Sequence, residues 1–335
     1  MPDMGCLDCP YRHANVAYPY AKSVPVKPYT IFYSMSDSRY TRFQKIGLIG
    51  KHGDPTVKET LLTLYEFLLS QNKEVIFEEA TCRLLKGKPL TSVPQIELAS
   101  HSDLVIVVGG DGTLLHAARV LASQNIPILG INLGRLGFLV DLSPDQMTAK
   151  LEEILNGRYE QECRFLLEVS MGDESSPHQN ILALNDVVLH KWNIARMIEF
   201  ETYVDDQLVN DQRSDGLIVS TPTGSTAYAL SGGGPLLYPT LNAVVMVPIC
   251  PHTLSNRPIV VDGDSTIEIH LHPAHAEDVQ ITCDGQATFP AMPGEVIKIR
   301  KAVHQVRLIH PQGYDYYSIL RAKLGWSENP KNNRC

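Results

Sequence analysis

Short apolar runs alternate with amphipathic stretches along residues 45–160. Each run has the length and continuous hydrophobicity of a buried strand, whereas the stretches between the runs have helical periods. This alternation predicts an α/β domain in which parallel strands are joined by right-handed crossovers. The predicted strands are residues 45–50, 74–78, 104–108 and 126–131.

Two of the predicted helices begin with capping signals. Asp54 and Pro55 place an N-cap before a proline at the first helical position, and this helix is expected to end near Ser70. Ser143 and Gln146 have the spacing of a capping box, and their helix is expected to end near residue 157, a glycine. Both helices fit the alternation of strands and helices from which the parallel sheet is predicted.

After about residue 160 the pattern changes to short β-like runs separated by turn residues. Few helical periods interrupt them, so we expect a second, all-β domain, built as a sandwich, over residues 161–315. Asp284 and Gly285 form a strong hairpin signal within it. Residues 316–335 include a short amphipathic segment, and we expect this part to pack back on the α/β domain. The predicted β-like runs are residues 182–191, 199–204, 217–220, 243–248, 259–262, 266–272, 279–283 and 296–300.

Residues 1–44 differ from the rest of the chain. They show no period of a strand or a helix, so we expect a flexible N-terminal extension. Met35 is a plausible native start, a hypothesis that the intact mass of the native protein would test. Cys6, Cys9 and His13 resemble half of a zinc site, but no second pair of ligands lies nearby.

The composition is that of an acidic globular protein. The 335 residues are 44% hydrophobic and 20% charged, with a net charge of −8, which argues against general nucleic-acid binding. No run approaches the ~20 apolar residues that cross a membrane, and no secretory signal opens the chain. The seven cysteines are odd in number and scattered. We therefore expect a cytoplasmic protein with reduced thiols, which binds small molecules rather than nucleic acid or a membrane.

Residues 109–113, Gly-Gly-Asp-Gly-Thr, join the predicted strand 104–108 to the next helix. Backbone amides at such a junction can bind phosphates, because glycine has no Cβ and a helix N-terminus favours anions. A carboxylate in this place repels such a ligand. Asp111 is therefore either an ordinary helix cap or a group that accepts a proton or meets a metal.

A second polar cluster, residues 221–228, reads Thr-Pro-Thr-Gly-Ser-Thr-Ala-Tyr and precedes a glycine-rich loop that begins at Ser231. Hydroxyls and exposed amides suit the edges of ribose, phosphate and adenine. A capped helix start would explain only some of them. The cluster therefore favours a nucleotide site.

Other polar residues have two interpretations each. Asn185 and Asp186 lie within an apolar run and need partners, which could be a neighbouring loop or the hydroxyls of a ribose. Arg213 can bind a phosphate with its forked donors, or it can pair with Asp215. The chain has no P-loop motif and no G-x-G-x-x-G after a strand, so its phosphate-binding glycines are of another kind.

Together these motifs resemble the NAD kinase family of bacterial type. The Gly-Gly-Asp-Gly-Thr element alone is shared with diacylglycerol kinases, sphingosine kinases and 6-phosphofructokinases, but its combination with residues 221–228 is far more specific. The similarity covers roughly residues 45–327. The segments that carry it are residues 109–113, 130–134, 136–139, 185–186, 215–228, 251–255 and 257–259.

The resemblance implies an N-terminal Rossmann-like α/β domain and a C-terminal β-sandwich domain, with NAD between them and often in a homo-oligomer (dimer or tetramer). It implies ATP-dependent phosphorylation of the 2′-hydroxyl of the adenosine ribose of NAD, which gives NADP and ADP. Since no set of metal ligands is visible in the sequence, we expect Mg²⁺ or another divalent cation to arrive with ATP.

The resemblance also implies the site residues. Asp111 would be the catalytic residue at the reacting hydroxyl, and Asn185 and Asp186 would bind hydroxyl and amide groups of NAD. Asp186 stands where many relatives carry Glu, which shortens its reach. Asp215 would lie on the nicotinamide side. The further cofactor-binding positions are Gly109, Gly110, Gly112, Thr113, Phe138, Arg196, Arg213, Thr223, Thr226, Ala227, Tyr228, Ser231 and Gln286.

Three other functions compete with this interpretation. A related lipid or sugar kinase is disfavoured by residues 221–228 and by Asn185, a non-catalytic NAD(P) sensor by the intact Asp111, and a dehydrogenase by the missing dinucleotide motif. Polyphosphate as the donor and NADH as the acceptor stay open as alternatives to ATP and NAD.

Overall fold

The computed structural model describes residues 43–54, 56–85, 90–134, 136–172, 181–192, 197–253, 255–272, 279–291 and 295–326. Most of the expected N-terminal extension, with Met35, Cys6 and Cys9, lies outside the described residues, as do Pro55 and Arg196.

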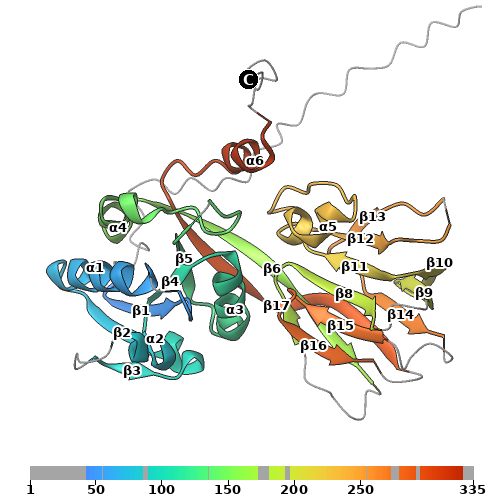
Figure 1. Cartoon of the computed structure of the whole chain (residues 1–335), viewed down its shortest axis with the longest axis horizontal. Helices are drawn as coiled ribbons and strands as arrows, with labels where there is room; N and C mark the ends of the chain where they lie inside the picture. The colour runs from blue at the N-terminus through green and yellow to red at the C-terminus, as the bar shows by residue number, and fades with distance from the viewer. Residues whose placement is uncertain are drawn as a thin grey trace, which may run out of the picture. The chain divides into compact units, whose positions relative to one another are not determined.

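A parallel sheet organises the first half of the described chain (Figure 1). Its strands lie in the order β17-β5-β4-β1-β2-β3, and neighbours in this order run parallel. The order reverses between β1 and β4, and ligands bind outside the carboxyl ends of the strands at such a switch point. The strands are β1 (Lys45–Gly50), β2 (Glu74–Glu78), β3 (Ser92–Val93), β4 (Leu104–Gly109), β5 (Pro127–Asn132) and β17 (Val296–Pro311).

Helices cover both faces of this sheet, which is why its strands are apolar throughout. On one face, α1 (Thr56–Ser70) and α4 (Met147–Leu155) bury apolar side chains against the strands. On the other face lie α3 (Asp111–Leu121) and the 3₁₀ helix η1 (Gln95–Ser100). The remaining helical segments of this half are α2 (Glu79–Leu84), η2 (Ala122–Gln124) and η3 (Pro144–Gln146).

The two predicted helix starts differ in outcome. Asp54 caps α1, because its carboxylate accepts a hydrogen bond from the Thr56 amide at 3.1 Å. The predicted capping box is wrong: residues 144–146 form a 3₁₀ turn without a side-chain cap, and the Gln146 amide donates to the Ser143 carbonyl instead. Helix α4 then ends as expected before Gly157, which has a φ of 84°.

Two sheets face each other in the rest of the described chain, which confirms the predicted sandwich. One sheet has the order β13-β12-β11-β8-β15-β16, and the other continues the parallel sheet through β17, β14, β9 and β10. Phe200 and Ile269 from the second sheet share a core with Val219 and Ile281 from the first. The elements are β6 (Tyr159–Met171), β7 (Ile181–Ala183), β8 (Asp186–Lys191), β9 (Ile198–Val204), β10 (Gln207–Ser214), β11 (Gly216–Ser220), η4 (Gly224–Thr226), α5 (Tyr228–Ser231), β12 (Ala243–Ile249), β13 (Ile259–Asp262), β14 (Ile267–Leu271), β15 (Val279–Cys283) and β16 (Ala287–Pro290).

The predicted strand over residues 182–191 is interrupted in the structure. It divides into β7 and β8 at Leu184 and Asn185. The carbonyls of these two residues accept hydrogen bonds from the Thr221 hydroxyl (2.6 Å) and the Thr221 amide (2.9 Å), so the chain turns toward residue 221 instead of continuing its ladder.

Strand β17 belongs to both halves of the described chain. Residues 296–299 pair with β14, whereas residues 307–309 pair with β5 in the parallel sheet. Strand β6 runs antiparallel beside both parts, with a register shift between Lys301 and Gln305. The parallel sheet and the sandwich therefore share a continuous backbone ladder.

Helix α6 (Tyr316–Leu324) follows β17 and contacts residues of both halves. The Tyr316 ring lies 5.5 Å from that of Tyr238, and the Tyr316 hydroxyl donates to the Leu237 carbonyl. The Lys323 ammonium lies 5.5 Å from the ring centroid of Phe138. Among the described helices, none is both long enough and apolar enough to span a membrane.

Candidate functional site

The glycine turn lies at the switch point of the parallel sheet. Strand β4 ends at Gly109, and α3 begins at Asp111, with Gly110 as its N-cap. A Cβ on Gly109 would lie 2.5 Å from the Thr113 hydroxyl, so this close turn requires glycine. The end of β1 lies beside it, since the Lys51 amide donates to the Val108 carbonyl at 2.8 Å.

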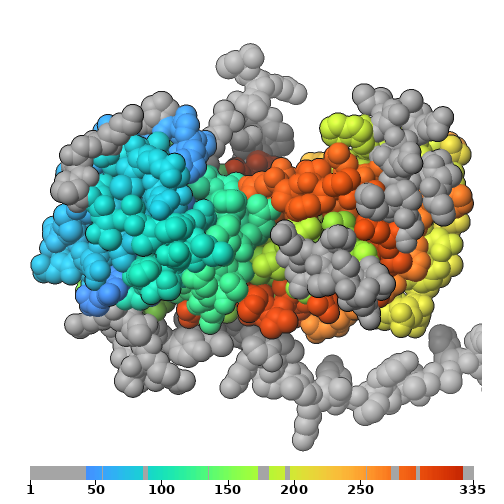
Figure 2. All heavy atoms as spheres, turned by 90° about the horizontal axis from the view of Figure 1, so that it is seen from below, coloured from blue at the N-terminus to red at the C-terminus, as the bar shows by residue number. Residues whose placement is uncertain are grey.

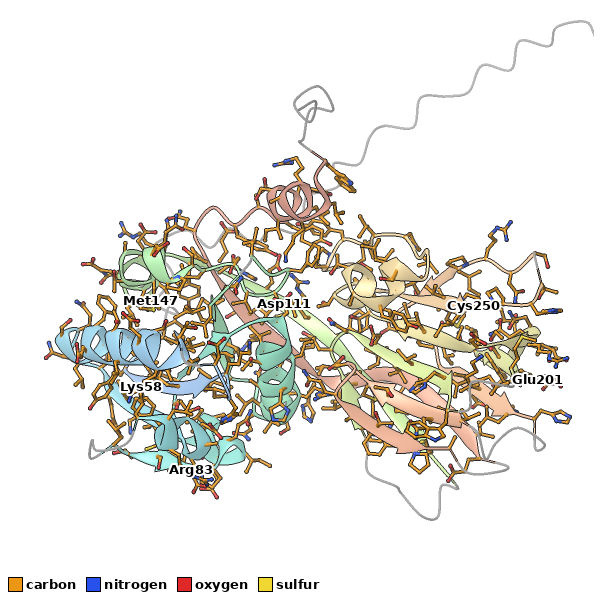
Figure 3. The ribbon with its side chains drawn as sticks, viewed as in Figure 1. Lys58, Arg83, Asp111, Met147, Glu201 and Cys250 are labelled. Carbon is orange, nitrogen blue, oxygen red and sulfur yellow. The ribbon has the colours of Figure 1, made fainter. Side chains whose placement is uncertain are left out.

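Asp111 lies at the N-terminal end of α3, on the side of the parallel sheet that adjoins the β-rich half (Figure 3). Its carboxylate accepts backbone hydrogen bonds from Phe138 (2.9 Å), Leu139 (3.2 Å) and Val140 (3.2 Å). A Cβ on Gly137 would lie 2.1 Å from the Asp111 carboxylate, so only glycine leaves room for this arrangement. Asp111 therefore does not cap its own helix. Instead, the loop over residues 137–140 holds it in one orientation.

A cavity of about 620 Å³ opens in front of the glycine turn. Backbone amides at the start of α3 and the cationic side chain of Lys51 suit an anionic ligand in this place. Burial lowers the pKa of the His116 imidazole, and the neighbouring Arg119 lowers it further. We call the 620 Å³ cavity the phosphate cavity. Its lining residues are Lys51, His52, Gly110, Gly112, Thr113, His116 and Gln286.

A second cavity, of about 470 Å³, lies in the β-rich half. Burial raises the pKa of Asp186 to about 7, and the nearby Asp284 carboxylate raises it as well, although a backbone hydrogen bond from Tyr228 opposes them. Near neutral pH this carboxyl can therefore be either a donor or an acceptor. We call the 470 Å³ cavity the acceptor cavity. Its lining residues are Asn185, Asp186, Val188, His190, Ala227, Tyr228, Thr282, Asp284 and Gly285.

The β15–β16 hairpin turn separates the two cavities. Asp284 and Gly285 line the acceptor cavity, whereas Gln286 lines the phosphate cavity. Asp284 and Gly285 have positive φ angles of 53° and 64°, as the predicted hairpin signal requires. Figure 2 shows the green part of the chain that includes α3 next to the orange part that includes this hairpin.

The hydroxyl-rich segment mostly binds its own backbone. The Thr226 hydroxyl donates to the Thr223 carbonyl at 3.2 Å, and the buried Thr223 hydroxyl accepts from Arg164 at 3.2 Å. Ser225 is likewise bonded to the carbonyl of Pro222 at 2.7 Å. These hydroxyls fix the turn, which in turn presents Ala227 and Tyr228 to the acceptor cavity.

Several of the predicted site residues are not among those that line the two cavities. Arg213, exposed on β10, faces Glu199 at 3.4 Å, and Asp215 pairs with Lys191 at 2.5 Å, so the alternative in which Arg213 pairs with Asp215 is not what the structure shows. Phe138 donates its amide to Asp111, and Ser231 is an exposed residue at the end of α5.

Sequence reasoning missed two residues at the junction of the cavities. Arg119 follows Asp111 by eight residues on the same helix, a spacing that places both on one face, and its guanidinium lies 3.6 Å from Asp284. The helical spacing of Arg119 was a usable signal. For Asp284 the sequence indicated only a position in a hairpin turn. Its side-chain contacts could not be predicted, because its partners are distant in sequence.

Comparison with known proteins identifies the family. A family model described as the ATP-NAD kinase N-terminal domain matches residues 46–159, and one described as the ATP-NAD kinase C-terminal domain matches residues 184–311. The chain belongs to the ATP-NAD kinase family. NAD kinases from Hahella chejuensis and Nitrosococcus oceani are each 49% identical to it, over 86% and 85% of this chain and 97% of each relative.

Solved structures of the NAD kinase family share the fold. Yeast NADH kinase complexed with NADH has a TM-score of 0.78 at 26% identity, over 85% of this chain and 89% of that one. An NAD kinase from Archaeoglobus fulgidus in complex with ATP has a TM-score of 0.65 at 28% identity, over 84% of this chain and 98% of that one. The chain thus has the family's function, that of a phosphotransferase acting on NAD.

Proposed function

We propose that the chain transfers the terminal phosphoryl group of ATP to the 2′-hydroxyl of the adenosine ribose of NAD, with Asp111 as the residue that takes or orients the hydroxyl proton. The observation that carries this proposal is the position of Asp111 in the glycine turn. That turn lines the phosphate cavity, and it meets the hairpin that lines the acceptor cavity.

The phosphate cavity suits the donor. Phosphoryl transfer depends on alignment and on neutralising charge, and the amides of the glycine turn with Lys51 supply both to a triphosphate. The described residues contain no group of three or more His, Cys, Asp or Glu side chains that could hold a metal ion. We therefore write the donor as the magnesium complex of ATP, in which the cation offsets phosphate charge and belongs to the substrate. The ATP complex of the Archaeoglobus relative supports this donor.

The acceptor cavity suits an adenosine. Asn185 and Asp186 present amide and carboxyl groups that match ribose hydroxyls, and the half-exposed Tyr228 ring offers a flat apolar surface to a base. Both carboxylate oxygens of Asp111 together offer about four acceptor positions. Three are taken by the amides of Phe138, Leu139 and Val140, which leaves one for the 2′-hydroxyl.

The finer parts of the proposal rest on the family resemblance. One of them is a cytoplasmic location. The other is contact with the nucleotides from Arg213, Asp215, Thr223, Thr226, Ser231 and Arg196, of which the last lies outside the described residues. A homo-oligomer is supported by exposed apolar side chains on two edge strands, Leu208 and Val209 on β10 and Val260 on β13.

One assay tests the function. The purified full chain is incubated with NAD, Mg²⁺ and ATP, and NADP is measured with an NADP-specific dehydrogenase. Parallel arms replace ATP by inorganic polyphosphate, NAD by NADH, and NAD by a diacylglycerol or a sugar. We expect NADP, or NADPH in the arm with NADH, to form only when a dinucleotide and a phosphate donor are both present. Binding of NAD without formation of NADP would favour the sensor, and phosphorylation of lipid or sugar alone would favour the related kinases.

A further inference from the structure

One side chain ties the helix of the glycine turn to the wall between the two cavities. Arg119 lies on α3 with a side chain only 12% exposed. Its guanidinium donates to the Cys283 carbonyl (3.1 Å) and to the Gln286 side-chain oxygen (2.7 Å), and it lies 3.6 Å from the Asp284 carboxylate. All three partners belong to the β15–β16 hairpin.

The side chains of Asp284 and Gln286, which Arg119 contacts, make further hydrogen bonds to residues that line the two cavities or lie next to them. The Gln286 amide nitrogen donates to the Gly112 carbonyl at 2.7 Å, so it returns to the glycine turn itself. The fully buried Asp284 carboxylate accepts hydrogen bonds at 2.7–3.3 Å from the backbone amides of Leu184, Asn185 and Asp186, of which Asn185 and Asp186 line the acceptor cavity. A chain of direct contacts therefore runs from the glycine turn to the wall that holds Asn185 and Asp186.

We propose that Arg119, Asp284 and Gln286 form a clasp that sets the distance between the phosphate cavity and the acceptor cavity, with Arg119 as its positioning residue. The inference rests on the proposed function, because it assigns the alignment of donor and acceptor in that reaction. It also gives Gln286 a role different from nucleotide binding, since both ends of its amide are already bonded within the protein.

The chemistry explains why the alignment depends on arginine. A planar guanidinium reaches three acceptors at fixed angles, whereas a lysine ammonium is a point charge that cannot hold the same fork. Removal of the cation would also leave the buried Asp284 carboxylate unpaired. A misplacement of about 1 Å between reacting groups can cost about a hundredfold in rate, so a loosened clasp acts on the rate of transfer more than on binding.

The test compares variants of the full chain in the NADP assay. We expect Arg119→Met to lower kcat by about 10- to 100-fold, while the KM values for NAD and ATP change by less than about threefold. Arg119→Lys, which keeps the charge, should recover part of kcat. Arg83→Met removes an exposed arginine that pairs with Glu79 on α2, and it should match the parent protein.

A double-mutant cycle separates the clasp from two unrelated structural effects. If Arg119 and Gln286 act as one unit, the loss of kcat in the double variant Arg119→Met with Gln286→Met falls well short of the product of the single losses. Multiplicative losses, an unchanged kcat in folded variants, or an effect on KM alone would overturn the clasp. Should Arg119→Met not fold, Arg119→Lys and Gln286→Met decide by the same criteria. An inactive parent protein would instead overturn the proposed function.

Discussion

At the scale of single residues, the proposed chemistry depends on how Asp111 is held. Three backbone amides fix its carboxylate, so an asparagine of the same shape would lose part of this seat and could not take a proton. We expect Asp111→Asn to lower kcat by about 10²- to 10⁴-fold, with the dissociation constant for NAD changed by less than about threefold. Steady-state kinetics and calorimetric titration of NAD would measure the two quantities.

The same substitution at an exposed position supplies the control for Asp111. Asp145 lies in η3 with an exposed side chain, and Asp145→Asn should leave kcat unchanged. An Asp111→Asn variant that keeps its kcat would remove Asp111 from the chemistry.

The buried Asp186 makes a prediction about pH. Its pKa is raised from 3.8 to about 7, chiefly by burial, so the folded protein binds a proton there that the unfolded chain releases near pH 4. The stability contributed by this proton is full below about pH 4 and is lost as the pH rises through about 7. Urea unfolding of the parent protein and of Asp186→Asn should show that the variant gains relative stability between pH 5 and pH 8.

This comparison isolates one carboxyl group because all other titrating groups are present in both proteins. Asparagine keeps the shape and the acceptor for the Tyr228 amide but does not ionise. A stability difference that stays constant from pH 5 to pH 8 would show that Asp186 is already ionised across this range.

At the scale of elements, the loop over residues 137–140 should matter as much as the helix that it serves. A Cβ on Gly137 would lie 2.1 Å from the Asp111 carboxylate and would push it out of its seat. We therefore expect Gly137→Ala to lower kcat by more than about tenfold, because displaced catalytic groups lose their alignment. The matched change Gly134→Ala meets no atom within 4 Å and should have a much smaller effect. Equal kcat values for the two variants would contradict the dependence on this seat.

Sequence patterns predicted the elements with continuous apolar or strictly alternating residues. Strands β1 and β2 match the predicted bounds, and β4 and β5 differ by a residue or two at their ends. Strand β6 was missed, and β17 was predicted only over its first residues. Both contain buried polar side chains that interrupt the apolar pattern. Arg164 on β6 pairs with Glu162 of the same strand, and the His310 ring on β17 lies 3.8 Å from the Glu162 carboxylate, so the partners that allow this burial do not show in the sequence pattern.

The candidate site was predicted as a set of motifs but not as a geometry. The glycine turn, Asn185, Asp186, Ala227 and Tyr228 do line the two cavities. The hydroxyls of residues 221–226 looked like ligand groups, yet most of those described bind backbone carbonyls. A hydroxyl satisfies backbone and ligand equally well, so composition alone does not distinguish the two uses.

At the scale of the whole molecule, the shared strand β17 should make unfolding cooperative across both halves. Leu308 is buried on β17, where it pairs with Ile128 of β5 and Glu162 of β6. We expect Leu308→Ala to lower the free energy of unfolding by about 2–5 kcal/mol, through lost burial and the cavity left behind. Val303, 89% exposed on the same strand, offers a control whose change to alanine should cost within about 0.5 kcal/mol.

Amide hydrogen exchange would show how far the loss spreads. If the ladder through β17 couples the halves, protection in β4 and in β11 should fall by the same free energy in Leu308→Ala. A loss confined to β4 and its neighbours would mean that the parallel sheet opens on its own.

The shared strand also constrains how recombination can shuffle this chain. The first matched family segment covers residues 46–159 and the second covers residues 184–311, which suggests two cassettes that could be exchanged between relatives. Yet residues 307–309, near the end of the second cassette, pair with β5 in the sheet of the first. A chimera that takes residues 184–311 from a relative would therefore also replace a strand of the recipient's parallel sheet. Viable crossovers should retain β6 and β17 from one parent together with β5, because the interface between the cassettes is a backbone ladder rather than a surface.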